Sequence, residues 1–574
     1  MYKSTDTLLS FNKLPSASVT FNWGSKASFT SGGTDANGNI SLLRKDFNVA
    51  NQANDGDSLF VNILTGKSHL FTGIIYKPFQ ITTWQDLQAM RVTLTGSYIL
   101  MNDITLPNHG TGKFPQKGFG PVGESLAKAF SGNFEGNNHT ISNLFINTIA
   151  QYAGLFGVAI LGTTSHKISN LKIVLRSTDS VYNKYANKYP YGSYLDFAQS
   201  GSTSIIATGA VVGLLCGGAI ENVSVTGGRV HAEAIPIPGL AGGIVSAGGI
   251  AGAIQSGTLG AKPLVNKCTS DATINSGTIL GGLIGIASGS VTNSSTTCNI
   301  NVPGGVYVGG LIGYFAGDST VVCSNNYTTG AINCGNDNIV GGLIAEVIGG
   351  KVKNCYTTGN ISGSIAYGGG LIGVLSTATS MNFYNNAYCT VSSCYATGSI
   401  STNYVGCIAV SGLIGSAGLA DSQHFIKITD CYASGTIDAG SAGEATGIAD
   451  MNVALSSTSL LIVKNCFYSG IKLSGISTTS NSYHNNNVNG IVIGGTPTPS
   501  LTFPFVSIQN VYANSSLTKN FTGHFDPNVQ LINIATFTTN PGAVIKTTAP
   551  FLGFDFANTW AFNSGNWPTL KNMP

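Results

Sequence analysis

A short aliphatic block flanked by glycines returns again and again along this chain. Its most regular form is Gly-Gly-Leu-Ile-Gly, found at 281–285, 309–313 and 369–373, with close variants at 341–345 and 411–415 and looser ones at 153–157, 213–217 and 248–252. Self-similarity at a period of roughly 20–50 residues is typical of a solenoid or array. A solenoid is first an elongated surface, so any chemistry needs separate support.

A second phrase accompanies the first and ends in Asn-Cys-Tyr or a close variant. It occurs at 351–363, 391–400, 428–437 and 463–471, with a variant at 324–332. Each copy alternates apolar and polar residues and then breaks at a glycine, which indicates strands and turns rather than helices. One coil of short strands cannot bury its apolar face alone, whereas stacked coils can. We therefore predict an all-β fold, a right-handed parallel β-helix in which the Leu-Ile pairs form ladders in a narrow core.

Both ends of the repeats carry residues suited to capping a solenoid, whose terminal core and strand edges need cover. Thr83-Trp-Gln-Asp86 resembles a capping box, and Trp84, Leu87 and Met90 form one apolar helical face, which predicts a short helix over 83–90. At the other end, large aromatic side chains predict a C-terminal cap: Phe551, Phe554, Phe556, Trp560 and Trp567.

These repeats resemble the GLUG-motif repeats of bacterial surface and secreted proteins, including filamentous-haemagglutinin-like adhesins and non-catalytic regions of some immunoglobulin A peptidases. The flanking segments 81–90, 96–104, 130–144 and 551–570 also match what surrounds such repeats. The resemblance covers roughly residues 80–574. It implies a β-helix at or outside a cell surface, and it implies no particular activity.

The composition describes a folded chain with an uncharged polar surface. Only 9% of the 574 residues are charged, the formal net charge is +3, and 75 residues are glycine. Leu, Ile, Val and aromatic residues are too frequent for disorder. The small net charge indicates neither nucleic acid nor an anionic membrane as a partner. A surface of Asn, Ser and Thr suits glycans or neighbouring copies of the same chain.

We predict three regions along the chain. Residues 1–75 would be a β-rich attachment or capping region, 76–490 the β-helix, and 491–574 a strand-rich cap that begins near Thr496-Pro-Thr-Pro499. The uncharged stretch 234–261 is long enough to span a bilayer. Its prolines, its glycines and its copy of the repeat block favour strands, so we expect no transmembrane segment. The N-terminus shows no apolar signal region.

Cysteine usage bears on the compartment in which the chain folds. The chain has 11 cysteines and no Cys-x-x-Cys spacing, so zinc and redox motifs are unsupported. Several precede an aromatic residue at one repeat position. This favours buried thiols that act as small apolar residues over a disulfide framework. Folding in a reducing compartment would suit a virion or phage fibre better than an exported adhesin.

No catalytic constellation emerges from the sequence, and we predict no catalytic, cofactor-binding or metal-binding residues and no cofactor. Asp430, Asp438 and Glu444 fit solvated turns better than an acid/base pair. His139 fits a structural donor, since no acidic or nucleophilic partner stands near it in the sequence. The stretch 35–39 lacks the glycine and glutamate of a calcium loop and fits a turn.

Three hypotheses remain. The first is a non-enzymatic extended surface protein for attachment, of adhesin or receptor-binding type, located outside the cell or on its surface. Its partner would be a host-surface glycan, a protein receptor or neighbouring copies in a surface assembly. The second is a structural fibre, spike or virion surface component. The third is a polysaccharide-degrading enzyme, because solenoids often serve that purpose.

Overall fold

The structure, a computed structural model, describes most of the repeats and separate stretches at both ends. The described residues are 7–11, 18–23, 27–31, 40–43, 58–65, 68–76, 78–108, 112, 115, 117–162, 166–176, 181–186, 205–235, 244–257, 260–304, 306–376, 388–418, 425–440, 444–451, 460–470, 473–474, 492–494, 505–514, 529–537, 551, 553–562, 566–571 and 573.

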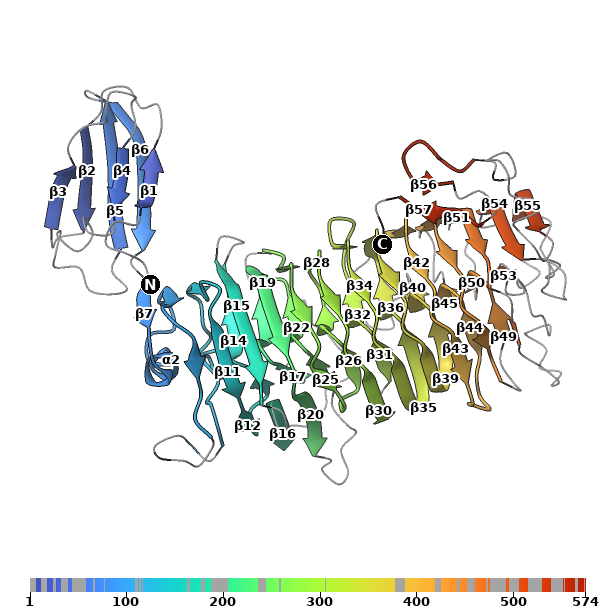
Figure 1. The fold of residues 1–574 in the computed structure, drawn as a ribbon, viewed down its shortest axis with the longest axis horizontal. Helices are drawn as coiled ribbons and strands as arrows, with labels where there is room; N and C mark the ends of the chain where they lie inside the picture. Colours follow the sequence, from blue (N-terminus) through green and yellow to red (C-terminus); the bar gives the residue numbers. More distant parts are fainter. Residues whose placement is uncertain are drawn as a thin grey trace.

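Three long parallel sheets run along the molecule and form a parallel β-helix, as predicted (Figure 1). We call them sheet 1, with 22 strands, sheet 2, with 17 strands, and sheet 3, with 10 strands. Successive coils between β10 (Phe134–Glu135) and β53 (Val492–Gly494) contribute strands to the three sheets in turn. One coil comprises β33 (Val322–Ser324) and β34 (Tyr327–Thr328) in sheet 1, β35 (Ile332–Gly341) in sheet 2 and β36 (Ile344–Ile348) in sheet 3.

The following coils repeat this order in the same register. The next contains β37 (Gly350–Lys353), β38 (Tyr356–Thr357), β39 (Ile361–Gly369) and β40 (Ile372–Ser376). The one after contains β41 (Tyr388–Ser392), β42 (Tyr395–Ala396), β43 (Ile400–Thr402), β44 (Ala409–Ser411) and β45 (Ile414–Gly418). Sheet 1 continues through β46 (Phe425–Thr429), β47 (Tyr432–Ala433), β51 (Leu460–Tyr468), β54 (Phe505–Asn514) and β55 (Val529–Phe537).

The Leu-Ile pairs of the repeated block stack directly on one another. Ile312 pairs in parallel register with Ile344, and Ile344 with Ile372. Along the adjoining bend the N–H of Leu343 donates to the carbonyl of Leu371 at 2.9 Å. The leucines and isoleucines of the five closest copies have no exposed surface: Leu283, Ile284, Leu311, Ile312, Leu343, Ile344, Leu371, Ile372, Leu413 and Ile414. The predicted core ladder is confirmed.

Two glycine positions of the repeat are required by close backbone approach. A Cβ on Gly342 would overlap the carbonyl oxygen of Gly370 on the next coil. A Cβ on Gly359 would overlap the carbonyl oxygen of Gly330 on the preceding coil. Only glycine allows this approach without displacing the backbone.

The predicted capping helix is present as α2 (Trp84–Ala89), next to the first strands of sheet 1, β7 (Phe79–Ile81) and β8 (Tyr98–Leu100). Thr83 Oγ1 accepts from the N–H of Asp86 at 3.1 Å, and Asp86 Oδ2 accepts from the N–H of Thr83 at 2.9 Å. This is the reciprocal capping box that the sequence indicated. Leu87 and Met90 are buried against the core, and Trp84 packs beside them.

The stretch 234–261 contributes strands rather than a helix. Its described part includes the end of β20 (Arg229–Ile235), together with β21 (Ile244–Gly248) and β22 (Ala251–Gln255), all paired with neighbouring coils. Within the described ranges, no helix has the length and apolar character needed to cross a membrane.

The N-terminal region consists of antiparallel strands, unlike the repeats. β1 (Thr7–Phe11) pairs with β4 (Ile40–Leu43). β3 (Ala27–Ser31), β2 (Ser18–Trp23), β5 (Ser58–Thr65) and β6 (Ser68–Tyr76) form a four-stranded sheet in that order. The predicted turn at 35–39 lies outside the described residues. Parallel pairing continues past residue 490 through β54 and β55, so this part of the predicted cap region is also strand-rich.

All eleven cysteines are buried and free. Cys355, Cys394, Cys431 and Cys466 occupy one position on successive coils, and the Sγ of Cys394 donates to the carbonyl of Ser392 at 3.2 Å. The thiols thus act as small buried residues in a ladder, as expected from the sequence.

Candidate functional site

A sharp corner lies within or between the strands of successive sheet 1 segments and fixes what the outer surface presents. The residue at this corner has φ between 51° and 57° in ten coils: Asn170, Asn222, Lys267, Asn293, Asn325, Asn354, Ser393, Asp430, Asn465 and Asn510. Asparagine tolerates this left-handed conformation better than most residues because its short polar side chain bonds locally. The first residue of the Asn-Cys-Tyr phrase is therefore the corner residue.

The asparagine side chains form a hydrogen-bonded ladder along the corner. Asn325 Nδ2 donates to Asn293 Oδ1 at 3.1 Å, and Asn354 Nδ2 donates to Asn325 Oδ1 at 3.1 Å. Further toward the C-terminus, Asn510 Nδ2 donates to Asn465 Oδ1 at 2.9 Å. The bonded amides thus keep a fixed orientation, exposed at Asn293, Asn325 and Asn354 and buried at Asn465 and Asn510.

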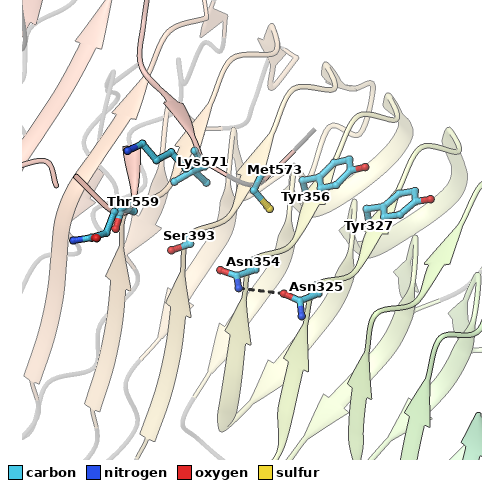
Figure 2. A pocket seen from close by; sticks show the side chains of 10 residues that line it. Asn325, Tyr327, Asn354, Tyr356, Ser393, Thr559, Lys571 and Met573 are labelled. Atoms are coloured by element: carbon cyan, nitrogen blue, oxygen red, sulfur yellow. Dashed lines mark hydrogen bonds between the residues drawn. The ribbon is translucent and has the colours of Figure 1, made fainter. Parts of the chain in front are cut away.

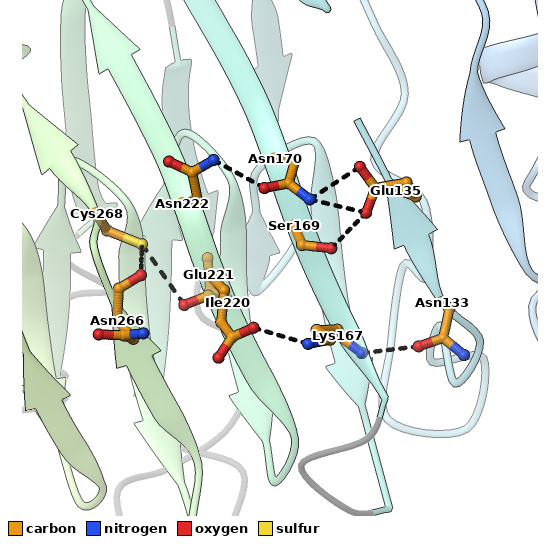
Figure 3. A network of polar contacts seen from close by, with 10 residues as sticks. All are labelled: Asn133, Glu135, Lys167, Ser169, Asn170, Ile220, Glu221, Asn222, Asn266 and Cys268. Carbon is orange, nitrogen blue, oxygen red and sulfur yellow. Dashed lines mark hydrogen bonds and ion pairs between the residues drawn. The ribbon is translucent and has the colours of Figure 1, made fainter. Parts of the chain in front are cut away.

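The N-terminal part of the ladder ends on a carboxylate (Figure 3). Asn222 Nδ2 donates to Asn170 Oδ1 at 2.8 Å, and Asn170 Nδ2 donates to both oxygens of Glu135 at 3.1 Å. On the same strands Lys167 Nζ pairs with Glu221 Oε2 at 2.8 Å. Glu135 thus ends the ladder as a hydrogen-bond acceptor, and Lys167 and Glu221 neutralise each other beside it.

Two residues beyond the corner, aromatic rings stack from coil to coil. Tyr327 and Tyr356 lie 5.0 Å apart between ring centroids with an interplanar angle of 5°. The stack continues through Tyr395, Tyr432 and Phe467 at 4.9–5.0 Å with angles up to 9°. On the preceding coil, the residue in register with Tyr327 is Ser295, which has no ring. One end of the stack is therefore not covered by another aromatic residue of the ladder.

The C-terminal segment folds back over the other end of this stack, with β56 (Trp560–Ala561) and β57 (Thr569–Leu570) paired antiparallel. Trp567 stacks on Phe467 at 4.9 Å, and Trp560 is buried beside Phe467 at 5.6 Å. Trp560 Nε1 donates to Oδ1 of the corner residue Asp430 at 3.3 Å. Phe551, Phe554 and Phe556 join the same cluster. The predicted aromatic residues thus gather as a cap over the aromatic stack of sheet 1, in a cluster separate from the Leu-Ile core that they were expected to close.

A pocket of about 480 Å³ lies between this cap and the corner (Figure 2). One wall is the ladder and the stack, and the other is the cap. The lining residues are Asn325, Tyr327, Asn354, Tyr356, Ser393, Asn558, Thr559, Leu570, Lys571 and Met573. Tyr327 is 36% exposed, whereas Tyr395, further along the stack, is 4% exposed. The pocket thus begins where the cap stops covering the aromatic stack.

The pocket is electrically neutral apart from Lys571. That ammonium group donates to the carbonyls of Phe556 and Ala557, both at 2.8 Å, so it holds the cap segment together. Burial raises the pKa of the Tyr356 phenol, and the neighbouring Tyr327 adds to this rise. The phenol therefore stays protonated at neutral pH and offers the pocket an uncharged hydroxyl.

The acidic residues singled out in the sequence have structural partners. Asp430 accepts from Asn465 Nδ2 at 3.1 Å as well as from Trp560, and Asp438 Oδ1 accepts from the N–H of Gly440 at 3.1 Å. The side chain of Glu444 lies outside the described part of the structure. His139, predicted to be a structural donor, has an acidic neighbour that its sequence surroundings did not show, because Asp103 of the preceding coil places Oδ1 3.1 Å from His139 Nδ1. Coil stacking brings together residues 36 positions apart.

One carboxyl group stands out electrostatically. Desolvation raises the pKa of Glu346 on β36 to about 7, although a hydrogen bond with Tyr307 acts in the opposite direction. Among the described residues no group of three or more His, Cys, Asp or Glu side chains is placed to hold a metal ion.

The sequence contained a signal for the corner but none for the pocket. The recurrent asparagine before cysteine marked the left-handed position. The pocket depends on where the C-terminal segment returns, and no local pattern specifies that.

No protein-family model and no curated protein matches the chain. Among solved structures, a candidate immunoglobulin A1 protease from Bacteroides ovatus matches at 13% identity and a TM-score of 0.27, covering 86% of this chain and 92% of that one. An "IgA1 Protease" matches at 11% identity and a TM-score of 0.27, covering 98% of this chain and 33% of that one. Matches of this quality describe no activity for this chain, and the likeness to GLUG repeats stays a resemblance.

Proposed function

We propose that this protein is a non-catalytic, extended β-helical surface protein that mediates attachment, with its place outside the cell or on a cell surface. One observation carries the proposal: the long corner of sheet 1 presents neutral amides and aromatic rings at fixed spacing and borders an open pocket whose single charged lining residue, Lys571, is already hydrogen bonded. Recognition of a surface ligand needs such ordered polar and aromatic groups in a concave site.

The chemistry of the pocket supports binding over bond cleavage. Glycoside hydrolysis uses two carboxyl groups that flank the scissile bond. The described lining residues offer amides, hydroxyls, phenols and one lysine that is already hydrogen bonded. The third sequence hypothesis, a polysaccharide-degrading enzyme, therefore receives no support from this site.

The test is binding by the full-length purified chain to intact cell surfaces, with a β-rich protein of similar size and charge as the control. The proposal expects saturable binding above that control. Incubation with immunoglobulin A1 and with a polysaccharide panel should leave both uncleaved. Absence of cell binding, or fragments that form only when the protein is present, would overturn the proposal.

The second candidate, a structural fibre or virion surface component, is favoured by the eleven buried free thiols, which suit folding in a reducing compartment. Electron microscopy of the purified protein and of its source particles separates the two. Ordered fibres or arrays would support assembly, and dispersed single molecules that bind cells would support attachment.

A further inference from the structure

The asparagine ladder is interrupted at Lys267 and again at Ser393, and the second interruption lies at the pocket. Ser393 occupies the corner between Asn354 and Asp430, and its side chain is too short to continue the ladder. Within the described structure, Oδ1 of Asn354 accepts no hydrogen bond, whereas Oδ1 of Asn325 accepts one from Asn354. The missing amide therefore leaves both a gap and an acceptor next to the aromatic stack (Figure 2).

The walls of the gap combine two kinds of group. The rings of Tyr327 and Tyr356 provide flat apolar surface, and the face of Tyr327 toward the preceding coil meets only Ser295 at that position. Around them lie the amides of Asn325, Asn354 and Asn558 and the hydroxyls of Ser393 and Thr559. We propose that this pocket is a binding site for a neutral carbohydrate, with a sugar ring against the tyrosine platform and its hydroxyls on the amides.

This inference rests on the proposed function and names the ligand class and the site. A sugar ring has apolar C–H faces and hydroxyls around its rim that both donate and accept. The apolar C–H faces pack well against aromatic rings, and the hydroxyls pair well with primary amides, which also both donate and accept. A pocket of about 480 Å³ has the size of a site for a short oligosaccharide and is too small to hold a large macromolecular surface.

Charge and backbone geometry disfavour the other ligand classes. An anion would need a free cation, and Lys571 already donates to two carbonyls. A peptide recognised as an added strand would need an unpaired strand edge. The sheet 1 strands beside the pocket, β34, β38 and β42, are instead paired on both sides. β57, which supplies Leu570 and pairs only with β56, is two residues long and offers too short an edge.

The central variant is Ser393→Asn, which would fill the gap with the amide that most of the other coils carry at the corner. Because the corner φ of 51° suits asparagine, this variant should fold at least as stably as the native chain. Its affinity for the sugar should fall about tenfold or more. Tyr327→Ala should weaken binding to a similar degree, and Tyr327→Phe should retain it because the ring remains.

Two matched controls lie outside the pocket. Asn222→Ala removes another amide of the same ladder, and Tyr388→Ala removes a tyrosine that is 56% exposed on the same sheet. Both should bind like the native chain. Thermal unfolding of every variant shows whether a loss of binding reflects a loss of folding.

The probe is a panel of neutral hexose and N-acetylhexosamine oligosaccharides, measured by titration calorimetry with the full-length chain. Binding that weakens in Ser393→Asn and Tyr327→Ala but not in the controls is the expected result. If Ser393→Asn bound the sugar as tightly as the native chain, the proposed location of the site would be wrong. The proposed attachment function would be unaffected by that result. Cell binding that protease treatment of the cells abolishes, without sugar binding, would overturn the ligand class alone. Absence of both sugar and cell binding would overturn the proposed function as well.

Discussion

At the residue scale, the corner of sheet 1 is held by positions that tolerate very few side chains. The left-handed corner favours asparagine, and the glycine that follows the Asn-Cys-Tyr phrase permits the coils to approach. Such positions recur on several successive coils, so one unfavourable substitution strains the contact between two coils. Because most of the corner positions hold asparagine, the serine at position 393 stands out as a departure from the repeat.

Gly359→Ala should destabilise the protein by about 1–3 kcal/mol, because the added methyl group would overlap the carbonyl oxygen of Gly330. Chemical denaturation of the variant measures this change. Gly162→Ala is the control, since a Cβ at Gly162 would meet no atom within 4 Å. Equal stability of the two variants would contradict the proposed stacking distance.

The thiols should be unreactive in the folded protein. Burial raises the pKa of Cys268 and of Cys389 to about 12, so the reactive thiolate is scarce at pH 8. A thiol reagent should label almost none of the 11 cysteines in native buffer and all of them in denaturant. Rapid labelling of several cysteines in the native protein would contradict this burial.

Cys394→Ser should fold with a modest loss of stability, of about 1 kcal/mol. The equivalent position on another coil is Ser294, whose Oγ donates to the carbonyl of Thr292 at 2.8 Å just as Cys394 Sγ donates to Ser392. Thermal unfolding of Cys394→Ser and Cys394→Asp compares a neutral donor with a charge. Equal loss in both would show that the position is not buried as described.

Glu346 should make stability depend on pH in a defined window. Its pKa is about 7 in the folded protein against 4.5 for a free carboxyl, so the folded state retains a proton that the unfolded state loses. Stability contributed by this group therefore falls as pH rises from about 4.5 to 7. Glu346→Gln should remove this dependence and raise stability at pH 8 by up to about 3 kcal/mol. If the difference in unfolding free energy between the native protein and Glu346→Gln were the same at pH 4 and at pH 8, the raised pKa of Glu346 would be contradicted.

At the element scale, the two ends of the β-helix use different closures. A six-residue helix with a reciprocal capping box covers the first coil, and an aromatic cluster on a returning segment covers sheet 1 near the last coils. The first was predictable because its contacts are local, from Thr83 to Met90. The aromatic residues of the second were also predictable as a cap. Their place was not, because Trp560 contacts Asp430, which is 130 positions away in the chain.

Trp560→Ala should destabilise the cap by about 3–5 kcal/mol, since the indole is fully buried between the cap and the ring of Phe467. Hydrogen exchange should increase in 553–571 and over Tyr432 and Phe467, while the Leu-Ile ladder near residue 283 stays protected. Uniform loss of protection along the whole chain would show that the cap is not a separate closing element.

At the scale of the whole molecule, the chain is an array of coils whose inner side is fixed by repetition and whose outer side varies. The repeated Leu-Ile pairs and glycines predicted the architecture because each coil must match its neighbours. The candidate site escaped prediction because it combines one departure from the repeat, Ser393, with the return of the C-terminal segment. The binding site that we propose therefore lies where the repeat is broken.

The stacking of coils in one fixed register is the central claim, and cross-linking tests it most directly. Thr390 on β41 lies in register with Lys427 on β46, and Lys427 with Ile462 on β51. Adjacent strands lie about 4.8 Å apart, within reach of a disulfide, and alternate strands about twice that, beyond reach. The double variant Thr390→Cys/Lys427→Cys should form a disulfide on oxidation, detected by mass spectrometry, and Thr390→Cys/Ile462→Cys should not. The opposite result, or a bond in neither, would contradict the register on which the fold and the pocket depend.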